Sequence, residues 1–343
     1  QGGAVFPQPE TEETAGMIPS WGQILTRIPR LESGDWQAMG GLKRWLVATR
    51  SAVLIMTLIS AGLGIAFAAE LGPVDWLNSA LALLGLTLAH ATNNLLNDWV
   101  DYRKGVDKDN YFRTQYGPQP VQSGLLSERA LLGYVLGTGL AACACGVWLV
   151  LRTDLLTLYL MLAGMFFVLF YTWPLKYIGL GEPSVWLVWG PLMVAGSCYV
   201  ASGTVSEAVL WFSLIYGLGP TTVLLGKHTD KLAEDRAKHI HTLPVILGER
   251  VSRGLTVACW QMQYAGITLG VLLGVLGWPF LLVWLAAPKL LAARRVFRQP
   301  RPGQAPADLP AGVWPLYLVA YAFDHNRAFS LALLAAVTLQ LML

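Results

Sequence analysis

The chain contains 343 residues, of which 55% are hydrophobic and 13% are charged, and its formal net charge at pH 7 is +3. Soluble domains usually carry about 25% charged residues, so this composition, with a mean hydropathy of +0.50, excludes an ordinary soluble protein. We therefore predict an all-α membrane protein that crosses the lipid bilayer several times.

The first 40 residues are polar and contain proline and glycine. They lack a basic segment followed by a short apolar core, so we expect no cleavable signal peptide. We predict a polar cytoplasmic tail over residues 1–40, with a surface-lying helix around Trp21–Leu31, and a transmembrane domain over residues 41–343.

Nine apolar runs follow, each near the length of about 20 residues that a helix needs to cross a bilayer. They predict a bundle of about nine transmembrane helices, in which we expect a central cavity open to the cytoplasmic side. A proline-rich loop over 298–310 precedes the segment 315–323, which we interpret as an interfacial or re-entrant piece rather than a crossing. The nine runs cover residues 46–69, 76–97, 129–151, 155–173, 183–203, 207–226, 252–273, 274–293 and 328–343.

The distribution of charge indicates how the helices are oriented. Positively charged loops stay on the cytoplasmic side of membranes. With nine crossings, all but one of the 24 Lys and Arg residues fall on one side, and Arg152 is the exception. A miscount by one helix would abolish this separation. We therefore predict that the N-terminus and both polar clusters described next are cytoplasmic.

A first polar cluster ends the second apolar run. At about 100° per residue, His90, Asn94, Asn97, Asp98 and Asp101 share a helical sector of roughly 100°. Amides and carboxylates at the end of a lipid-compatible segment cost free energy unless a cation or a partner compensates them. The pattern predicts an ion site at the membrane rim, and the alternative is a set of solvated charges at a helix end.

A second polar cluster follows the sixth run, on the same predicted side. Asp230 and Glu234 are four residues apart and therefore neighbours on one helical face, and Asp235 lies next to them. Mg²⁺ prefers hard oxygen ligands and usually keeps substrate phosphates in its shell. Two facing carboxylate clusters with interleaved basic residues therefore favour a metal-bridged diphosphate, and solvated loop charges are again the alternative.

Several basic residues are candidates to bind the diphosphate and neutralise its remaining negative charge. Arg50 lies early in the first run, where it is either a diphosphate contact or an arginine that snorkels to the interface. The other candidates are Arg103, Lys104, Lys227 and Arg236.

These motifs resemble those of the UbiA superfamily of intramembrane prenyltransferases. Asn97, Asp98, Asp101, Gly105 and Asp107 form an Asn-Asp-x-x-Asp-x-x-x-Gly-x-Asp pattern similar to that of the 1,4-dihydroxy-2-naphthoate prenyltransferase branch. The segments 117–127, 171–182 and 190–196 resemble that branch as well, and they stand in the same order.

The resemblance implies an enzyme that transfers an isoprenoid chain from a prenyl diphosphate to an aromatic acceptor similar to a naphthoate or a quinone precursor. It implies Mg²⁺ as the cofactor, a catalytic role for Asp98 and Asp101, and an isoprenoid tail that runs toward lipid. Tyr171 and Lys176 are expected near the diphosphate and the allylic cation, or else as interface anchors. No nucleic-acid partner is expected. The implied Mg²⁺ ligands are Asn94, Asn97, Asp98, Asp101, Asp230 and Glu234, with Asp235 next.

The second cluster departs from the usual pattern of the branch, which reads Asn-Asn-x-Arg-Asp-x-x-x-Asp before Gly-Lys-x-Thr-Leu. Alignment back from the Thr-Leu pair at 242–243 places Asp235 on the second aspartate and Lys231 on the first. The four-residue spacing selects Asp230 and Glu234 instead, and we prefer this pair. A non-quinone acceptor and a terpene cyclase of the same superfamily stay open as alternatives. A membrane transporter or scaffold is the alternative that is not an enzyme.

Overall fold

The computed structural model describes residues 18–26, 29, 31, 33–106, 119–307, 309 and 313–343. Within these ranges every regular element is a helix, apart from one isolated bridge between Ile178 and His241. The all-α class predicted from the composition is confirmed.

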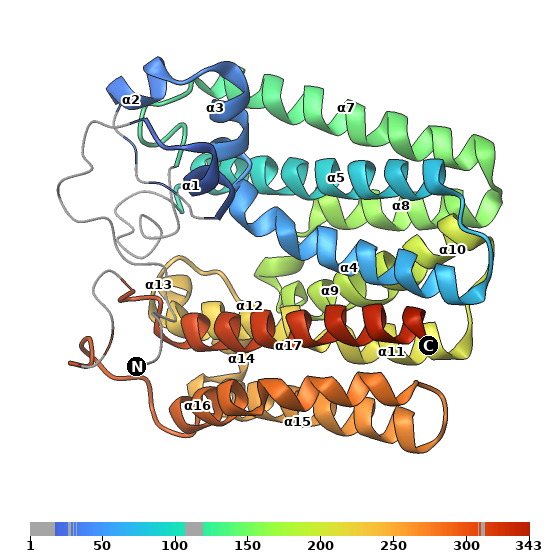
Figure 1. The fold of residues 1–343 in the computed structure, drawn as a ribbon. Coiled ribbons are helices and arrows are strands. Elements are labelled where there is room, and N and C mark those ends of the chain that lie inside the picture. Colours follow the sequence, from blue (N-terminus) through green and yellow to red (C-terminus); the bar gives the residue numbers. More distant parts are fainter. Residues whose placement is uncertain are drawn as a thin grey trace.

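The long helices run side by side, and short helices gather at one end of the bundle, on the left of Figure 1. The short helices at this end are α1 (Trp21–Thr26), α2 (Ser33–Ala38), α3 (Gly41–Ala48) and α13 (Leu232–Ala237). The remaining elements, in chain order, are α4 (Ser51–Leu71), α5 (Trp76–Arg103), α7 (Glu128–Arg152), α8 (Leu155–Phe170), η2 (Leu175–Tyr177), α9 (Gly181–Leu187), η3 (Val188–Ala195), α10 (Gly196–Ser202), α11 (Glu207–Tyr216), α12 (Leu218–Asp230), α14 (Leu243–Leu247), α15 (Glu249–Leu272), η4 (Trp278–Ala286), α16 (Ala287–Phe297) and α17 (Tyr317–Met342).

Local sequence fixes where several helices begin. Asp75, Ser127, Asp154 and Ser206 precede α5, α7, α8 and α11, and the side chain of each accepts a hydrogen bond from a backbone N–H of the first turn. Such caps satisfy donors that have no partner inside the helix, and each contributes about 1 kcal/mol. Each of these helices therefore begins directly after its capping residue.

The core that joins the helices is aromatic. Phe67 of α4 lies 4.8 Å from Phe212 of α11 and 5.6 Å from Phe280 of η4, measured between ring centroids. Phe329 of α17 belongs to the same buried cluster. The first helix of the bundle is thus packed against elements from its second half.

The N-terminal segment adds to a second core cluster. Ile24, Trp36 and Met39 are buried together with Leu95 of α5 and Leu131 of α7. The described part of the predicted tail therefore packs against two long helices, and the structure places α1 in the region of the expected surface helix.

Most of each apolar run is helical in the described residues, although the number of crossings stays a prediction. By length and apolar composition, four continuous helical stretches are able to cross a membrane: Ser51–Leu71, Glu128–Arg152, Gly181–Ser202 and Glu207–Asp230. The third joins α9, η3 and α10, and its middle part is π-helical around Pro191, which has no N–H to donate.

Two details of the expected helices are corrected. The first run was expected to be one helix from residue 46, but the chain breaks between α3 and α4, where Arg50 has a left-handed backbone with φ of 55°. The segment 315–323 was expected to be interfacial or re-entrant, but Tyr317–Phe323 form the first turns of α17. This helix begins early because Asp230 of α12 accepts hydrogen bonds from the N–H groups of Leu318 and Val319.

Candidate active site

A cavity of about 910 Å³ lies inside the bundle. Its polar residues come from the start of α4, the end of α5 and the end of α12, which meet at the end of the bundle where the short helices gather (Figure 1). Its apolar wall is formed mainly by α4, α5, α7, α8 and the Gly181–Ser202 stretch. The polar lining includes Arg50, Asn94, Asn97, Asp101, Lys176, Lys227, His228 and Lys231.

The first polar cluster is held together by contacts to two other parts of the chain. The side-chain amide of Asn94 donates to the carbonyl of Thr49 over 2.9 Å. The amide of Asn97 donates to the hydroxyl of Thr172 over 3.2 Å. The cluster that the helical period predicted is thus anchored to the break before α4 on one side and to the segment after α8 on the other.

Each aspartate of this cluster faces a cation. Asp98, whose side chain is 3% exposed, forms an ion pair with Arg50. Asp101 accepts a hydrogen bond of 3.1 Å from Nζ of Lys176, and both side chains are 5% exposed. A non-glycine residue with positive φ is strained, and at Arg50 this backbone places the guanidinium against the carboxylate. Arg50 therefore meets the polar cluster, and its role as a diphosphate contact stays a prediction.

Lys176 and Tyr171 flank the turn after α8. The N–H of Lys176 donates to the carbonyl of Tyr171 over 2.9 Å, and both side chains line the cavity. Burial lowers the pKa of Lys176, and the nearby carboxylates of Asp101 and Asp235 oppose this effect. Lys176 is thus a buried cation whose charge depends on the two acidic clusters together.

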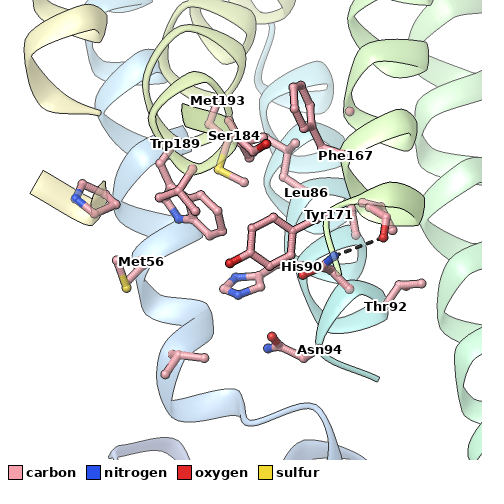
Figure 2. Close-up of a pocket in the computed structure, with 18 of the residues that line it drawn as sticks. Met56, Leu86, His90, Thr92, Asn94, Phe167, Tyr171, Ser184, Trp189 and Met193 are labelled. Atoms are coloured by element: carbon pink, nitrogen blue, oxygen red, sulfur yellow. Dashed lines mark hydrogen bonds between the residues drawn. The ribbon is translucent and has the colours of Figure 1, made fainter. Parts of the chain in front are cut away.

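The middle of the cavity is aromatic. Figure 2 shows Tyr171 beside the imidazole of His90, with Trp189 and Met193 on the same side of the cavity. The rings of His90 and Trp189 meet edge to face with centroids 5.2 Å apart. Nδ1 of His90 is 2.8 Å from the hydroxyl of Thr57, which fixes the ring. An aromatic region therefore adjoins the polar end of the cavity.

The second polar cluster is divided between the cavity and the helix packing. Asp230 lies outside the cavity lining, with its side chain 0% exposed. Its carboxylate accepts hydrogen bonds of 2.9 Å from the N–H groups of Leu318 and Val319 and from Nε of Arg301. These contacts satisfy the carboxylate, so the structure assigns Asp230 to the junction of α12 and α17 and does not bring it to the first cluster.

Asp235 rather than Asp230 lies near the first cluster. Its carboxylate is close enough to Lys176 to favour the charged form of that lysine. It also lies 2.7 Å from Nζ of Lys231. None of Asp230, Glu234 and Asp235 is among the residues that line the cavity. Asp235 nevertheless acts on Lys176, so the structure agrees better with the alignment that placed Asp235 on the second family aspartate than with the preferred pair, Asp230 and Glu234.

The other candidate residues lie at varied distances from the cavity. Lys227 lines it, whereas Arg103, Lys104 and Arg236 are exposed and outside the lining. Arg103 pairs with Glu128, and Nζ of Lys104 lies 4.9 Å from the ring centroid of Trp173.

Gly105 ends α5 with φ of 66°, a conformation that favours glycine at a helix C-terminus. It therefore serves to stop the helix after the acidic motif. Asp107 lies outside the described residues.

The sequence reasoning missed a buried hydrogen bond beside this site. Nδ1 of His228 is 2.7 Å from Oε1 of Glu182, and their side chains are 2% and 1% exposed. His228 lines the cavity. A single glutamate at the start of an apolar run was the available signal, because a carboxylate at that depth needs a partner.

The residues at the polar end fit the Mg²⁺ ion that the resemblance implies. Among the described residues, no group of three or more His, Cys, Asp or Glu side chains is arranged to hold a metal ion. Mg²⁺ needs only one or two carboxylates when amides, water and substrate phosphate complete its shell. Oδ2 of Asp235 is buried and has no hydrogen-bond partner among the described residues, which leaves a hard oxygen donor available. The fitting donors are Asn94, Asn97, Asp98, Asp101 and Asp235.

Two curated relatives are similar over most of their length. The chain is 31% identical over 282 residues to 1,4-dihydroxy-2-naphthoate octaprenyltransferase from Escherichia coli (strain K12), a match that covers 78% of this chain and 89% of that protein. It is 29% identical over 263 residues to digeranylgeranylglyceryl phosphate synthase from Natronomonas pharaonis, covering 75% of this chain and 86% of that protein.

Two solved structures share the fold. The apo structure of a UbiA homolog from Aeropyrum pernix K1 gives a TM-score of 0.64 at 20% identity, over 84% of this chain and 98% of the other. A UbiA homolog from Archaeoglobus fulgidus bound to GPP and Mg²⁺ gives 0.56 at 13% identity, over 86% and 99%.

The model of the UbiA prenyltransferase family matches residues 54–314. Because this match spans well over half of the sequence, the chain belongs to the UbiA prenyltransferase family, enzymes that transfer alkyl groups other than methyl.

Proposed function

We propose that this enzyme uses Mg²⁺ to transfer an isoprenoid chain from a prenyl diphosphate to an aromatic acceptor, with release of diphosphate. One observation carries the proposal: a single cavity joins a cationic, oxygen-rich end to an aromatic middle and an apolar remainder. These three environments match the diphosphate, the reacting carbon and the isoprenoid tail of such a donor.

The cationic end suits the diphosphate. Arg50, Lys176, Lys227 and Lys231 line it, and charge-assisted hydrogen bonds from such groups are short and strong. Bound Mg²⁺ would supply further positive charge to the leaving group. The proposed metal ligands are Asn94, Asn97, Asp98, Asp101 and Asp235, because these oxygen donors lie at or beside this end.

The apolar wall suits the isoprenoid tail. It contains Gly85 of α5, Gly139 and Gly146 of α7, and Gly164 of α8. Glycine leaves space where other residues would fill it; a Cβ on Gly146 would lie 2.8 Å from Sδ of Met161. We propose that the tail lies between these helices and extends toward lipid.

The aromatic middle suits the reacting carbon. When the carbon–oxygen bond of the donor breaks, positive charge develops on the allylic carbon, and ring faces such as those of Tyr171 and Trp189 stabilise a cation by roughly 0.5–2 kcal/mol. Attack by an electron-rich ring carbon of the acceptor forms the new carbon–carbon bond, and loss of the proton from that carbon restores the aromatic ring. His228, oriented by Glu182, stands at the same cavity and is positioned to hold a polar group of the acceptor.

The first acidic motif and the Escherichia coli relative favour a naphthoate-like or quinone-precursor acceptor. The relative named for digeranylgeranylglyceryl phosphate synthesis supports a non-quinone acceptor as the second candidate. Family membership argues against the transporter or scaffold alternative. The positive charge of the loops at the cavity end supports a cytoplasmic active site and N-terminus.

A product assay in membranes tests the proposal. Prenyl diphosphates from geranyl to long polyprenyl are offered with Mg²⁺ and a panel of hydroxylated aromatic acids, and a glycerol phosphate is included for the second candidate. Transfer to an aromatic ring is expected, and it should be lost in Asp101→Asn but kept in Asp75→Asn, whose carboxylate caps α5 at the opposite end. Products formed from donor alone would indicate a cyclase, and a folded protein that consumes no donor would refute the proposal.

A further inference from the structure

Lys231 is the unexpected residue of the second polar cluster. It follows the last residue of α12, its side chain is 16% exposed, and it lines the cavity. Its Nζ lies 2.7 Å from Oδ1 of Asp235. The position that aligns with the first aspartate of the family motif thus carries an ammonium group, which is paired with the second aspartate.

The pair leaves half of the Asp235 carboxylate unused. The side chain of Asp235 is 3% exposed, and its Oδ2 is buried with no hydrogen-bond partner in the part of the chain that the structure describes. A buried acceptor without a partner costs about 1–3 kcal/mol. Lys231 therefore pairs with Oδ1 of Asp235, and only Oδ2 is left to bind a ligand that arrives with the substrate.

The charge of the cavity is already positive without a metal ion. Arg50, Lys176, Lys227, Lys231 and Arg327 line it, against two carboxylates, Asp101 and Asp324, among the described lining residues. Exchange of an aspartate for a lysine raises the local charge by two units, the charge of one Mg²⁺ ion. The chain itself thus provides what a second ion would add.

Lys231 and Asp235 are four residues apart, and such pairs are often no more than surface contacts of a helix, worth about 0.3–0.5 kcal/mol. Here Lys231 stands between two helices, since α12 ends at Asp230 and α13 begins at Leu232. Both side chains are largely buried, and Lys231 faces the cavity. The geometry therefore directs the ammonium group at the cavity rather than at solvent.

Resting on the function proposed above, we propose that Lys231 replaces one metal ion. Its ammonium group binds the prenyl diphosphate directly, and the donor complex holds a single divalent ion beside Asp98, Asp101 and Asp235.

Metal stoichiometry measured independently of turnover tests this inference. Mn²⁺ is titrated by electron paramagnetic resonance into the purified protein in the presence of geranyl S-thiolodiphosphate, a donor analogue that does not react. The wild type is expected to bind one Mn²⁺ per chain, and Lys231→Asp two. Lys231→Met is expected to keep one Mn²⁺ and to bind the analogue about tenfold more weakly, because a charge-assisted contact is lost.

Lys43→Met is the matched control, since Lys43 bonds to the carbonyl of Pro19 and lies outside the cavity lining; its affinity for the analogue should equal that of the wild type. Thermal unfolding verifies that each variant is folded. If Lys231→Asp does not fold, the affinity of Lys231→Met for the analogue decides the test. Two Mn²⁺ in the wild type, or unchanged affinity in Lys231→Met, would overturn the inference alone. A wild type that does not bind the analogue even with Mn²⁺ would overturn the proposed function as well.

Discussion

Two buried ion pairs at the polar end of the cavity each join two separate parts of the chain. Arg50 and Asp98 connect the start of α4 to α5, and Lys176 and Asp101 connect η2 to α5. A buried pair adds little net stability, yet loss of one partner leaves an uncompensated buried charge that costs about 3–5 kcal/mol. At the scale of single residues, charge balance is thus a condition for both folding and substrate binding.

Replacement of Lys176 tests this balance. Lys176→Met leaves the buried Asp101 without its cation, so we expect a loss of about 3–5 kcal/mol of stability together with loss of prenyl transfer. The double variant Lys176→Met, Asp101→Asn should regain most of the stability but none of the activity. Thermal unfolding in detergent and donor turnover measure the two effects; a double variant as unstable as the single one would contradict the argument.

Replacement of Glu182 tests the role of its pair with His228. Glu182→Gln replaces the carboxyl group that orients the imidazole, so turnover should fall by about 10–100-fold while binding of a prenyl diphosphate analogue stays unchanged. Glu207→Gln, at an exposed position that begins α11, should behave as wild type. Equal losses of turnover and donor affinity in Glu182→Gln would show that the pair only maintains the fold.

At the scale of the elements, the end of α12 serves two purposes within six residues. Asp230 turns away from the cavity to cap α17, whereas Lys231 lines the cavity and Asp235 pairs with Lys231. The two aspartates differ because α12 ends between them. One carboxylate therefore holds two helices together and the other is available to the substrate site.

The different roles of the two aspartates are separable. Asp230→Asn weakens the contact with Arg301 and the cap of α17, so we expect a stability loss of about 2–4 kcal/mol with unchanged affinity for Mn²⁺ in the presence of the donor analogue. Asp235→Asn should show the opposite emphasis: a smaller loss of stability, because its partner Lys231 lines the cavity, and an affinity for Mn²⁺ lowered at least about tenfold. The assignment fails if Asp230→Asn, when folded, is the variant that loses metal.

The glycine-lined wall between α5, α7 and α8 predicts a limit on donor length. No atom lies within 4 Å of a Cβ added at Gly164, so Gly164→Leu should fold and fill part of the wall. Turnover of long polyprenyl diphosphates should then fall by about tenfold or more relative to geranyl diphosphate. Gly137→Leu, at an exposed position of α7 outside the cavity lining, serves as the control. An equal effect on all donors would place the tail elsewhere.

At the scale of the whole molecule, the sequence predicts the features that depend on local pattern. Long apolar runs gave the helices, because a bilayer-length segment without charges has few other structures available. The polar face of α5 that lines the site was predictable because five polar residues share one helical sector. The break at Arg50, the partner of Asp230 and the pair of His228 with Glu182 were not, since each depends on contacts between distant segments. In the second cluster, alignment to the family motif identified Asp235, and spacing alone selected Asp230.

The charge asymmetry of the loops predicts which end of the bundle faces the cytoplasm. Cysteine placed at Arg250, at the start of α15, should react with a membrane-impermeant maleimide only after intact cells are permeabilised. Cysteine placed at Glu207 should react without permeabilisation, because it lies on the predicted opposite side. The wild type, labelled in parallel, corrects for its own four cysteines. The opposite labelling pattern would invert the predicted topology.

The bond between α12 and α17 also determines when the active site is completed during synthesis. The two backbone groups that hold Asp230 lie 88 and 89 residues further along the chain. While the ribosome is still making those residues, α12 already carries a buried acidic group that lacks these partners. The wall of the cavity that α17 contributes is added last, so a chain released before α17 would carry both acidic motifs in the membrane without a closed site for the donor.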